Sequence, residues 1–257
     1  MRRFWLMLLG MLLWTTSCLA DNVGVVVLHG RWGDPHGWIW NLTQQIASAG
    51  YPVEAPLMNW SLAKSYQGGL DESDREVSQA IEALRQRGAS RIVLIGHSIG
   101  GSFALRYART HALAGVIVIV PAPYLDLPGF HQKVQSDLDR AASMKAGGQG
   151  DDKAWFTDWN TNQTHKSLSM TANTFLSLYD PQGPMNIDQN ASALPAGLPV
   201  LWISATDESE KNREGNASAF ARVPDASHAR FIEVDADHLH APDASVVPVL
   251  AWLRQLD

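Results

Sequence analysis

Two hydrophobic periods alternate along most of the chain. Short unbroken apolar runs, which predict strands buried on both faces of a sheet, occupy 23–30, 91–96 and 114–122. Segments with apolar residues at helical spacing lie between or after them, at 37–50, 70–87 and 100–110. A shorter strand is expected at 51–56. Strands that alternate with helices predict an α/β domain of three layers, in which helices cover both faces of a mostly parallel sheet.

The alternation stops at 121–196, where adjacent glycines and polar turns predict an irregular helical excursion. It then resumes, with strands expected at 198–207 and 230–238 and helices at 209–221 and 242–256. Active sites of parallel sheets lie beyond the carboxyl ends of the strands. The residues that follow each strand are therefore the candidates for chemistry.

The first twenty residues differ from the rest. Arg2 and Arg3 precede an eleven-residue apolar run, and small residues lie at the two positions that a signal peptidase reads, the second of them Ala20. Residues 1–20 are therefore expected to be an export signal that is cleaved after Ala20.

Cleavage would leave 21–257 as one domain without a cysteine, because Cys18 is the only cysteine of the chain. Disulfides and cysteine-based zinc sites are then excluded, and export to a bacterial periplasm or secretion is the expected location. Two alternatives stay open. The uncleaved N-terminus could anchor the chain, although its apolar run is short for a bilayer span, or Cys18 could carry a lipid.

The charge balance narrows the range of partners. The formal charge of −6 becomes −8 once the signal is removed, because that segment carries two arginines and no acidic residue. This disfavours a nucleic-acid partner, since binding phosphates requires clustered Lys and Arg. No stable membrane span is expected in the mature chain.

The stretch GHSIG, residues 96–100, lies between a predicted strand and a predicted helix. In a tight strand-to-helix turn, the central residue adopts a strained backbone, and the residues two before and two after it crowd together. Only small residues fit there, which explains Gly96 and Gly100. The turn lifts the hydroxyl of Ser98 above the sheet, at a helix start that favours negative charge. The pattern predicts a nucleophilic serine.

A nucleophilic serine needs a base, and the base needs a carboxylate that orients it. After a turn of this kind the acid and then the histidine follow in chain order, each just past a strand end. Asp207 ends the strand VLWISATD and His238 follows the last strand, so these two residues are the expected acid and base. Glu208, adjacent to Asp207, and Asp180 are the alternatives for the acid.

Other histidines compete less well with His238. His240 is its nearest rival, but it lies beside Pro242 and is expected to turn outward or to pack on the cap. His228 precedes the last strand, which places it at the opposite edge of the sheet. His97 is expected to pack beside the nucleophile.

The stretch VVLHGRWGD follows the first strand and supplies the other half of the expected site. Its glycines allow a turn that aims a backbone N–H at the reacting carbonyl. Arg31 is the expected donor and Trp32 the next candidate, while Ile99 provides the second N–H. His29 is expected to be a structural hydrogen-bonding residue. His29 and His36 lack a supporting carboxylate pattern, so no metal site is expected.

The motifs LHGRWG, GHSIGG, SATD and DADH, in that order, resemble the α/β-hydrolase superfamily over nearly the whole mature chain. The resemblance implies acyl-enzyme chemistry on an ester or related bond, with no cofactor. It also implies a compact sheet of about six strands, because the leading strands of larger members are absent. A serine at the turn argues against the dehalogenase and epoxide-hydrolase branches, which use a carboxylate nucleophile. Insertions at the position of 121–196 often form a cap over the site.

The expected function is that of a serine hydrolase, most simply a carboxylesterase, acting on a small acyl substrate. A thioesterase, a peptidase or an acyltransferase would use the same three residues, and a non-catalytic binding protein on this scaffold is the alternative from another class. The tryptophans expected to line a substrate pocket are Trp32, Trp60, Trp155 and Trp159. For the last two, simple packing of the excursion on the body explains the sequence equally well.

Overall fold

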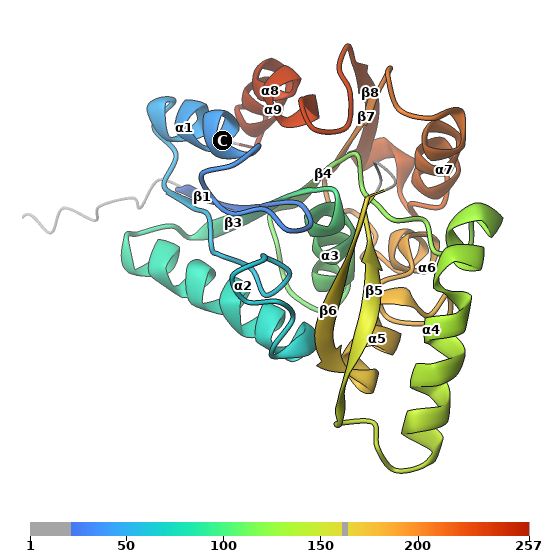
Figure 1. Ribbon diagram of the computed structural model, residues 1–257. Coiled ribbons are helices and arrows are strands. Elements are labelled where there is room, and N and C mark those ends of the chain that lie inside the picture. The colour runs from blue at the N-terminus through green and yellow to red at the C-terminus, as the bar shows by residue number, and fades with distance from the viewer. Residues whose placement is uncertain (1–21, 161–163, 257) are drawn as a thin grey trace, which may run out of the picture.

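The computed structural model describes residues 22–160 and 164–256, so the expected signal at 1–20 lies outside the described residues. Its centre is a six-stranded parallel sheet in the order β2-β1-β3-β4-β7-β8 (Figure 1). The strands are β1 (Val23–Leu28), β2 (Val53–Glu54), β3 (Arg91–His97), β4 (Gly115–Ile119), β7 (Val200–Ala205) and β8 (Ala229–Val234). The predicted fold class is confirmed.

Two hydrophobic cores lie on opposite faces of this sheet, because alternate residues of a strand point to opposite sides. Val25 and Val27 of β1 belong to one core, which the helices α1 (Trp40–Ser48) and α9 (Val246–Leu253) cover. Val26 and Leu28 belong to the other core. The helices on that side include α2 (Gly69–Gln86), α3 (Ile99–Ala108), α6 (Ile187–Ser192) and α7 (Glu210–Phe220).

The excursion at 121–196 begins with the long helix α4 (Pro128–Ala146) and returns through α5 (Ala172–Tyr179) and α6. Between α4 and α5 the chain forms an antiparallel hairpin of β5 (Lys153–Trp159) and β6 (His165–Thr171), which lies beside α4 in Figure 1. The expectation of irregular helices is therefore wrong for the hairpin. Phe156 and Asp158 are buried while Trp155 is exposed, which is the period of two that strands follow.

The last part of the chain also differs from the prediction. A single closing helix over 242–256 is expected, but the structure has two, α8 (Ala241–Ala244) and α9, which meet at Ser245. The break has a covalent cause, since Pro248 has no N–H to donate to the carbonyl of Ala244. A short 3-10 turn (Ala226–His228) precedes β8. No helix within 22–160 or 164–256 has the length and hydrophobicity needed to cross a bilayer.

Candidate active site

Ser98 occupies the turn between β3 and α3. Its φ of 55° and ψ of −123° are strained for a residue that carries a side chain. A Cβ at Gly96 would lie 2.1 Å from the carbonyl oxygen of Gly100, and a Cβ at Gly100 would lie 2.8 Å from those of Leu28 and His29. The backbone of this turn therefore admits only glycine at both positions, which is the geometric requirement that the sequence pattern expresses.

His238 joins the serine to a carboxylate. Its Nε2 lies 2.9 Å from the Oγ of Ser98, and its Nδ1 is hydrogen-bonded to the Oε1 of Glu208. The side chains of His238 and Glu208 are only 14% and 3% exposed, so little water competes for the contact between them. With the Nδ1–H donating to Glu208, the Nε2 is free to accept the proton of the Ser98 hydroxyl. The arrangement can activate a serine nucleophile.

The acid of this series differs from the predicted one. Asp207 is exposed, and its backbone N–H donates to the carbonyl of Ala236 over 3.1 Å in the turn after β7. That turn directs Glu208 toward His238 instead. The second carboxylate oxygen of Glu208 accepts a hydrogen bond of 2.6 Å from the side chain of Asn212, which fixes its orientation. Asp207 is thus corrected to Glu208, because the turn decides which of two adjacent carboxylates faces the histidine.

The other candidates from the sequence lie apart from this series. His240 is exposed and is hydrogen-bonded to the carboxylate of Asp237. His228 is exposed as well, and it pairs with Asp225 before β8 begins. Asp180 accepts the N–H of Gln182 in a turn that follows α5. None of these three residues contacts Ser98 or His238 in the described structure.

Two buried histidines support the loops of the site. The Nε2–H of His97 donates to the backbone carbonyl of His238 over 2.8 Å, and burial, followed by the nearby His238, lowers the pKa of His97 to about 3. The Nδ1–H of His29 donates to the carbonyl of Gly30, while its Nε2 accepts the N–H of Met58. Burial lowers the pKa of His29 to about 4. Both rings are therefore neutral at pH 7 and act as hydrogen-bonding supports.

Backbone N–H groups of Ile99 and Arg31 are available near the serine. Ile99 is the first residue of α3, and Arg31 lines the same cavity as Ser98. Neither N–H has an acceptor among the residues that the structure describes, whereas the N–H of Trp32 donates to the carbonyl of Trp60 over 3.0 Å. Of the two predicted choices in the loop after β1, the structure therefore favours Arg31 over Trp32 as a donor to a bound anion.

A family model described as the alpha/beta hydrolase family matches residues 25–249. The chain belongs to the α/β-hydrolase family. The matched range includes the serine turn, Glu208 and His238, and it confirms the resemblance seen in the sequence. No curated protein sequence matches the chain.

Solved structures share the α/β-hydrolase fold over almost the full chain. One comes from work on LipS and LipT, two metagenome-derived lipolytic enzymes, with a TM-score of 0.65, 17% identity and coverage of 91% of this chain and 94% of that chain. The monoacylglycerol lipase of Paleococcus ferrophilus has a TM-score of 0.62 at 17% identity, covering 91% and 94%. The siderophore hydrolase EstB of Aspergillus fumigatus has a TM-score of 0.61 at 16% identity, covering 94% and 93%. At such identities the likeness establishes the fold alone.

A buried polar cluster lies behind the loop after β1 of this α/β-hydrolase. We call it the Asp158 cluster; its members are Arg31, Trp32, Tyr66, Asp158 and Tyr179. The Arg31 guanidinium and the Tyr179 hydroxyl donate to one carboxylate oxygen of Asp158. The Trp32 indole and the Tyr66 hydroxyl donate to the other, over 2.7 and 2.8 Å. Sequence reasoning missed this cluster, because its five members come from four distant segments.

The Asp158 cluster keeps a full charge pair away from water. Asp158 is 0% exposed and the Arg31 side chain 3% exposed. Burial opposes the charge of Arg31, but the carboxylate of Asp158 and the two phenols outweigh it and hold the pKa of Arg31 above its usual value. The cluster thus connects the β5–β6 hairpin firmly to the loop that carries the Arg31 N–H.

The four tryptophans expected at a substrate pocket lie in different environments. Trp32 lines the cavity that contains Ser98. Trp60 is 1% exposed and its indole donates to the carbonyl of His29, so it is a core residue and the expectation is wrong. Trp155 is 66% exposed on β5, and Trp159 packs under the ammonium group of Lys133. Neither of these two residues of the excursion lines a cavity at Ser98 in the described structure.

Cavity residues that the sequence did not indicate include Trp38, Ile39, Leu127, Phe130, Lys133, Asn160, Lys211 and Leu239. Most of them come from loops and helix ends near the carboxyl edge of the sheet, where chain position indicates the region but not the direction of a side chain. Among the described residues there is no group of three or more His, Cys, Asp or Glu side chains that could hold a metal ion.

Proposed function

We propose that this protein is a serine hydrolase, most simply a carboxylesterase, that cleaves an ester through an acyl-enzyme on Ser98. The observation that carries the proposal is the continuous series from the strained Ser98 through His238 to the buried Glu208. Each member has the partner that its role requires: the nucleophile meets a base, and the base meets a carboxylate.

The proposed reaction begins when the Oγ of Ser98 attacks the carbonyl carbon of the ester and its proton passes to the Nε2 of His238. Glu208 orients the imidazole and stabilises its positive charge. The N–H groups of Arg31 and Ile99 donate to the oxygen that becomes negative. When the tetrahedral species collapses, the bond to the alcohol oxygen breaks, and His238 returns the proton to that oxygen.

Water completes the cycle. His238 removes a proton from a water molecule as its oxygen attacks the acyl carbon, and the bond between that carbon and the Oγ of Ser98 then breaks. The carboxylic acid leaves and Ser98 recovers its proton from His238. The steps need no group beyond those of the chain and water.

Thioesters, amides and transfer to another acceptor are compatible with the same residues. An ester is proposed because the named relatives of the fold include lipolytic enzymes and a monoacylglycerol lipase. A non-catalytic binding protein is the rival from another class. The complete series from Ser98 to Glu208 argues against it, since proteins that keep a scaffold and lose its chemistry usually lose a member of such a series.

A fluorophosphonate probe tests the proposal, because it reacts only with an activated serine. Peptide mapping should locate the label on Ser98, and Ser98→Ala should remove both labelling and hydrolysis of p-nitrophenyl acetate. Folded protein that is not labelled and cleaves no acyl substrate would refute the proposal. Equal binding of an ester by the wild type and Ser98→Ala, without turnover by either, would support the binding protein.

We further propose that the protein is exported and that its signal is removed after Ala20. The support comes from the pattern of residues 1–20 alone. Intact-mass analysis of protein from the periplasm or medium of a bacterial host should give a chain that begins at Asp21. A lipid-bearing Cys18, or an uncut chain in the membrane fraction, would contradict this.

A further inference from the structure

Two cavities of unequal size meet at His238. The serine chamber, about 220 Å³, is lined by Ser98 and by residues such as Arg31, Trp38 and Ile39. The helix chamber, about 670 Å³, lies against α4 and α7 and is lined by apolar residues such as Leu127 and Phe130, with charged residues that include Lys133, Asp207 and Lys211 among them. His238, Leu239 and Asn160 line both chambers. Ser98, among the residues that the structure describes, lines only the smaller one.

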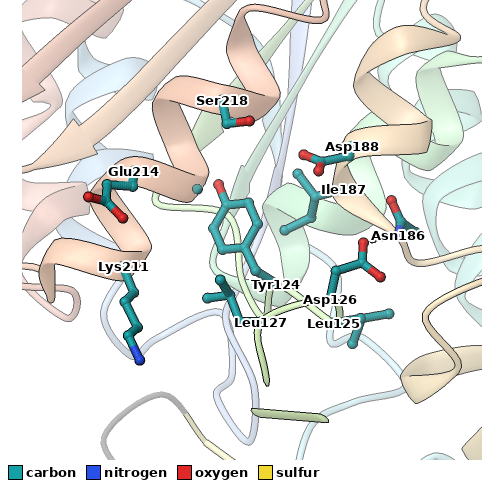
Figure 2. Close-up of a pocket in the computed structure, with 11 residues that line it drawn as sticks. Tyr124, Leu125, Asp126, Leu127, Asn186, Ile187, Asp188, Lys211, Glu214 and Ser218 are labelled. Carbon is teal, nitrogen blue, oxygen red and sulfur yellow. Dashed lines mark hydrogen bonds between the residues drawn. The ribbon is translucent and has the colours of Figure 1, made fainter. Parts of the chain in front are cut away.

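A third pocket of about 230 Å³ lies next to the helix chamber and shares Tyr124, Leu127 and Lys211 with it. Figure 2 shows the Tyr124 ring standing between the side chains of α7 and those of 126 and 186–188. A Cβ at Gly215 of α7 would lie 3.0 Å from that ring, so the ring and the glycine fit closely. The space on the helix side of His238 is larger than the space at Ser98.

The chemistry of acyl transfer assigns a part of the substrate to each side. The acyl group remains bonded to Ser98 after the alcohol has left, so it must occupy a space that Ser98 itself lines. The alcohol oxygen must lie within hydrogen-bonding reach of His238, which protonates it. The alcohol then extends on the side of His238 that faces away from Ser98, which is the helix chamber.

We propose that the substrate is an ester of a short acyl group with a bulky, largely apolar alcohol. This inference rests on the serine hydrolase proposed above. The serine chamber has the volume of roughly seven water molecules, which admits an acyl group of up to about six non-hydrogen atoms. The helix chamber, at about 670 Å³, admits an alcohol several times larger.

The length of the acyl or alkyl chain of the substrate tests the size of each chamber. Each methylene that is buried in the transition state raises kcat/KM about fourfold, and a methylene that stays in water contributes little. In a series of p-nitrophenyl esters, kcat/KM should rise from acetate to butanoate or hexanoate and then stop rising. In a series of alkyl acetates it should continue to rise up to the octyl ester.

Octyl acetate and ethyl octanoate form the decisive pair, because they are isomers in which the long alkyl chain lies on the alcohol side of the ester in one and on the acyl side in the other. Their hydrophobicity is closely matched, so a difference in kcat/KM reports which side of the carbonyl the protein accommodates. We expect octyl acetate to be preferred by about tenfold or more. Equal rates, or a preference for ethyl octanoate, would overturn the inference.

Gly129 of α4 is a position at which a larger side chain can be introduced beside the helix chamber. It lines the chamber, and a Cβ at this position would have no heavy atom within 4 Å. Gly129→Phe should lower the ratio of kcat/KM for octyl acetate to kcat/KM for ethyl acetate about tenfold relative to the matched Gly129→Ala. Unchanged hydrolysis of octyl acetate by folded Gly129→Phe would also overturn the inference.

The two proposals fail in different ways. If the serine hydrolase is wrong, neither isomer is hydrolysed and Ser98 is not labelled by the fluorophosphonate. If only the assignment of the chambers is wrong, Ser98 is labelled and both isomers are cleaved, with equal rates or with ethyl octanoate preferred.

Discussion

Asp158 on strand β5 binds the side chain of Arg31, the residue whose backbone N–H is the proposed oxyanion donor. Buried ion pairs give little net stability, because desolvation of the charges cancels most of their attraction. The value of this pair therefore lies in position. It fixes the side chain of Arg31, while the same carboxylate holds the indole of Trp32, whose φ of 59° is unusual for a residue other than glycine.

Variants of the charge pair should distinguish its effect on the position of the Arg31 loop from its effect on the free energy of unfolding. Asp158→Asn alone leaves the Arg31 charge buried and should destabilise the protein by about 3–5 kcal/mol in urea unfolding. The double variant Arg31→Met/Asp158→Asn removes both charges, keeps an acceptor for the indole and should recover much of that loss. Its kcat should still be about tenfold or more below the wild type, with KM changed by less than about threefold.

The control for this prediction is the partly exposed pair of Arg106 and Asp74, which joins α3 to α2 at N–O distances of 2.6 and 2.9 Å. Arg106→Met/Asp74→Asn should leave kcat unchanged. A folded Arg31→Met/Asp158→Asn variant with full kcat would show that the Asp158 cluster has no part in placing the loop.

Glu208 and Asp207 differ in what they contact, so their amide variants should differ in activity. Glu208→Gln removes the charge that stabilises the imidazolium of His238 and should lower kcat by roughly a thousandfold or more. Asp207→Asn should retain activity within about threefold, since the exposed Asp207 does not contact the histidine. Steady-state hydrolysis of p-nitrophenyl acetate measures both, and the reverse ranking would restore Asp207 as the acid.

The two histidines after β8 provide a similar comparison. His238→Ala removes the base and should lower kcat by roughly four powers of ten. His240→Ala removes an exposed side chain that pairs with Asp237 and should keep most of the activity. Circular dichroism confirms that both variants are folded. If His240→Ala were the inactive one, the proposed proton transfer from Ser98 would be wrong.

Acid should destabilise the protein through its buried histidines. The pKa is lowered in the folded state, to about 3 for His97 and about 4 for His29, so between those values and about 6.5 the unfolded chain binds more protons. The contribution of the two histidines to the free energy of unfolding is therefore complete above pH 6.5. It falls below that pH by about 1.4 kcal/mol per pH unit for each histidine.

Urea unfolding at several pH values measures that slope. His97→Asn keeps a hydrogen-bond donor but does not titrate, so its slope between pH 4 and 6.5 should be smaller than that of the wild type by about 1.4 kcal/mol per pH unit. Identical slopes would show that His97 is not buried in its neutral form.

The parts of the fold that the sequence predicts are those that a local pattern encodes. β1, β3 and β4 are buried on both faces, so each is an unbroken apolar run with turns at its ends. Ser98 was equally visible, because the strained turn demands glycines at fixed distances from it. The location of the base after the last strand follows from the alternation of strands and helices, because each strand ends at the same edge of the sheet.

The parts that escaped prediction depend on direction or on distant contacts. Asp207 and Glu208 are adjacent, and only the turn in three dimensions decides which of them faces His238. The β5 strand alternates as a strand should, but one of its inward positions holds Asp158. An inward carboxylate hides the pattern unless Arg31, 127 residues away, is known to meet it.

The position of β8 has a consequence for how the protein would lose activity on partial unfolding. β8 is the edge strand of the sheet and is half-exposed along most of its length, whereas its neighbour β7 is buried throughout. The base, His238, hangs from this outermost strand, while the nucleophile follows a central one. Edge strands fray at a lower free energy than the centre of a sheet. Mild heat or urea would then unfold β8 and displace His238 while the rest of the sheet stays folded, so activity would be lost before the core unfolds and would return when β8 refolds.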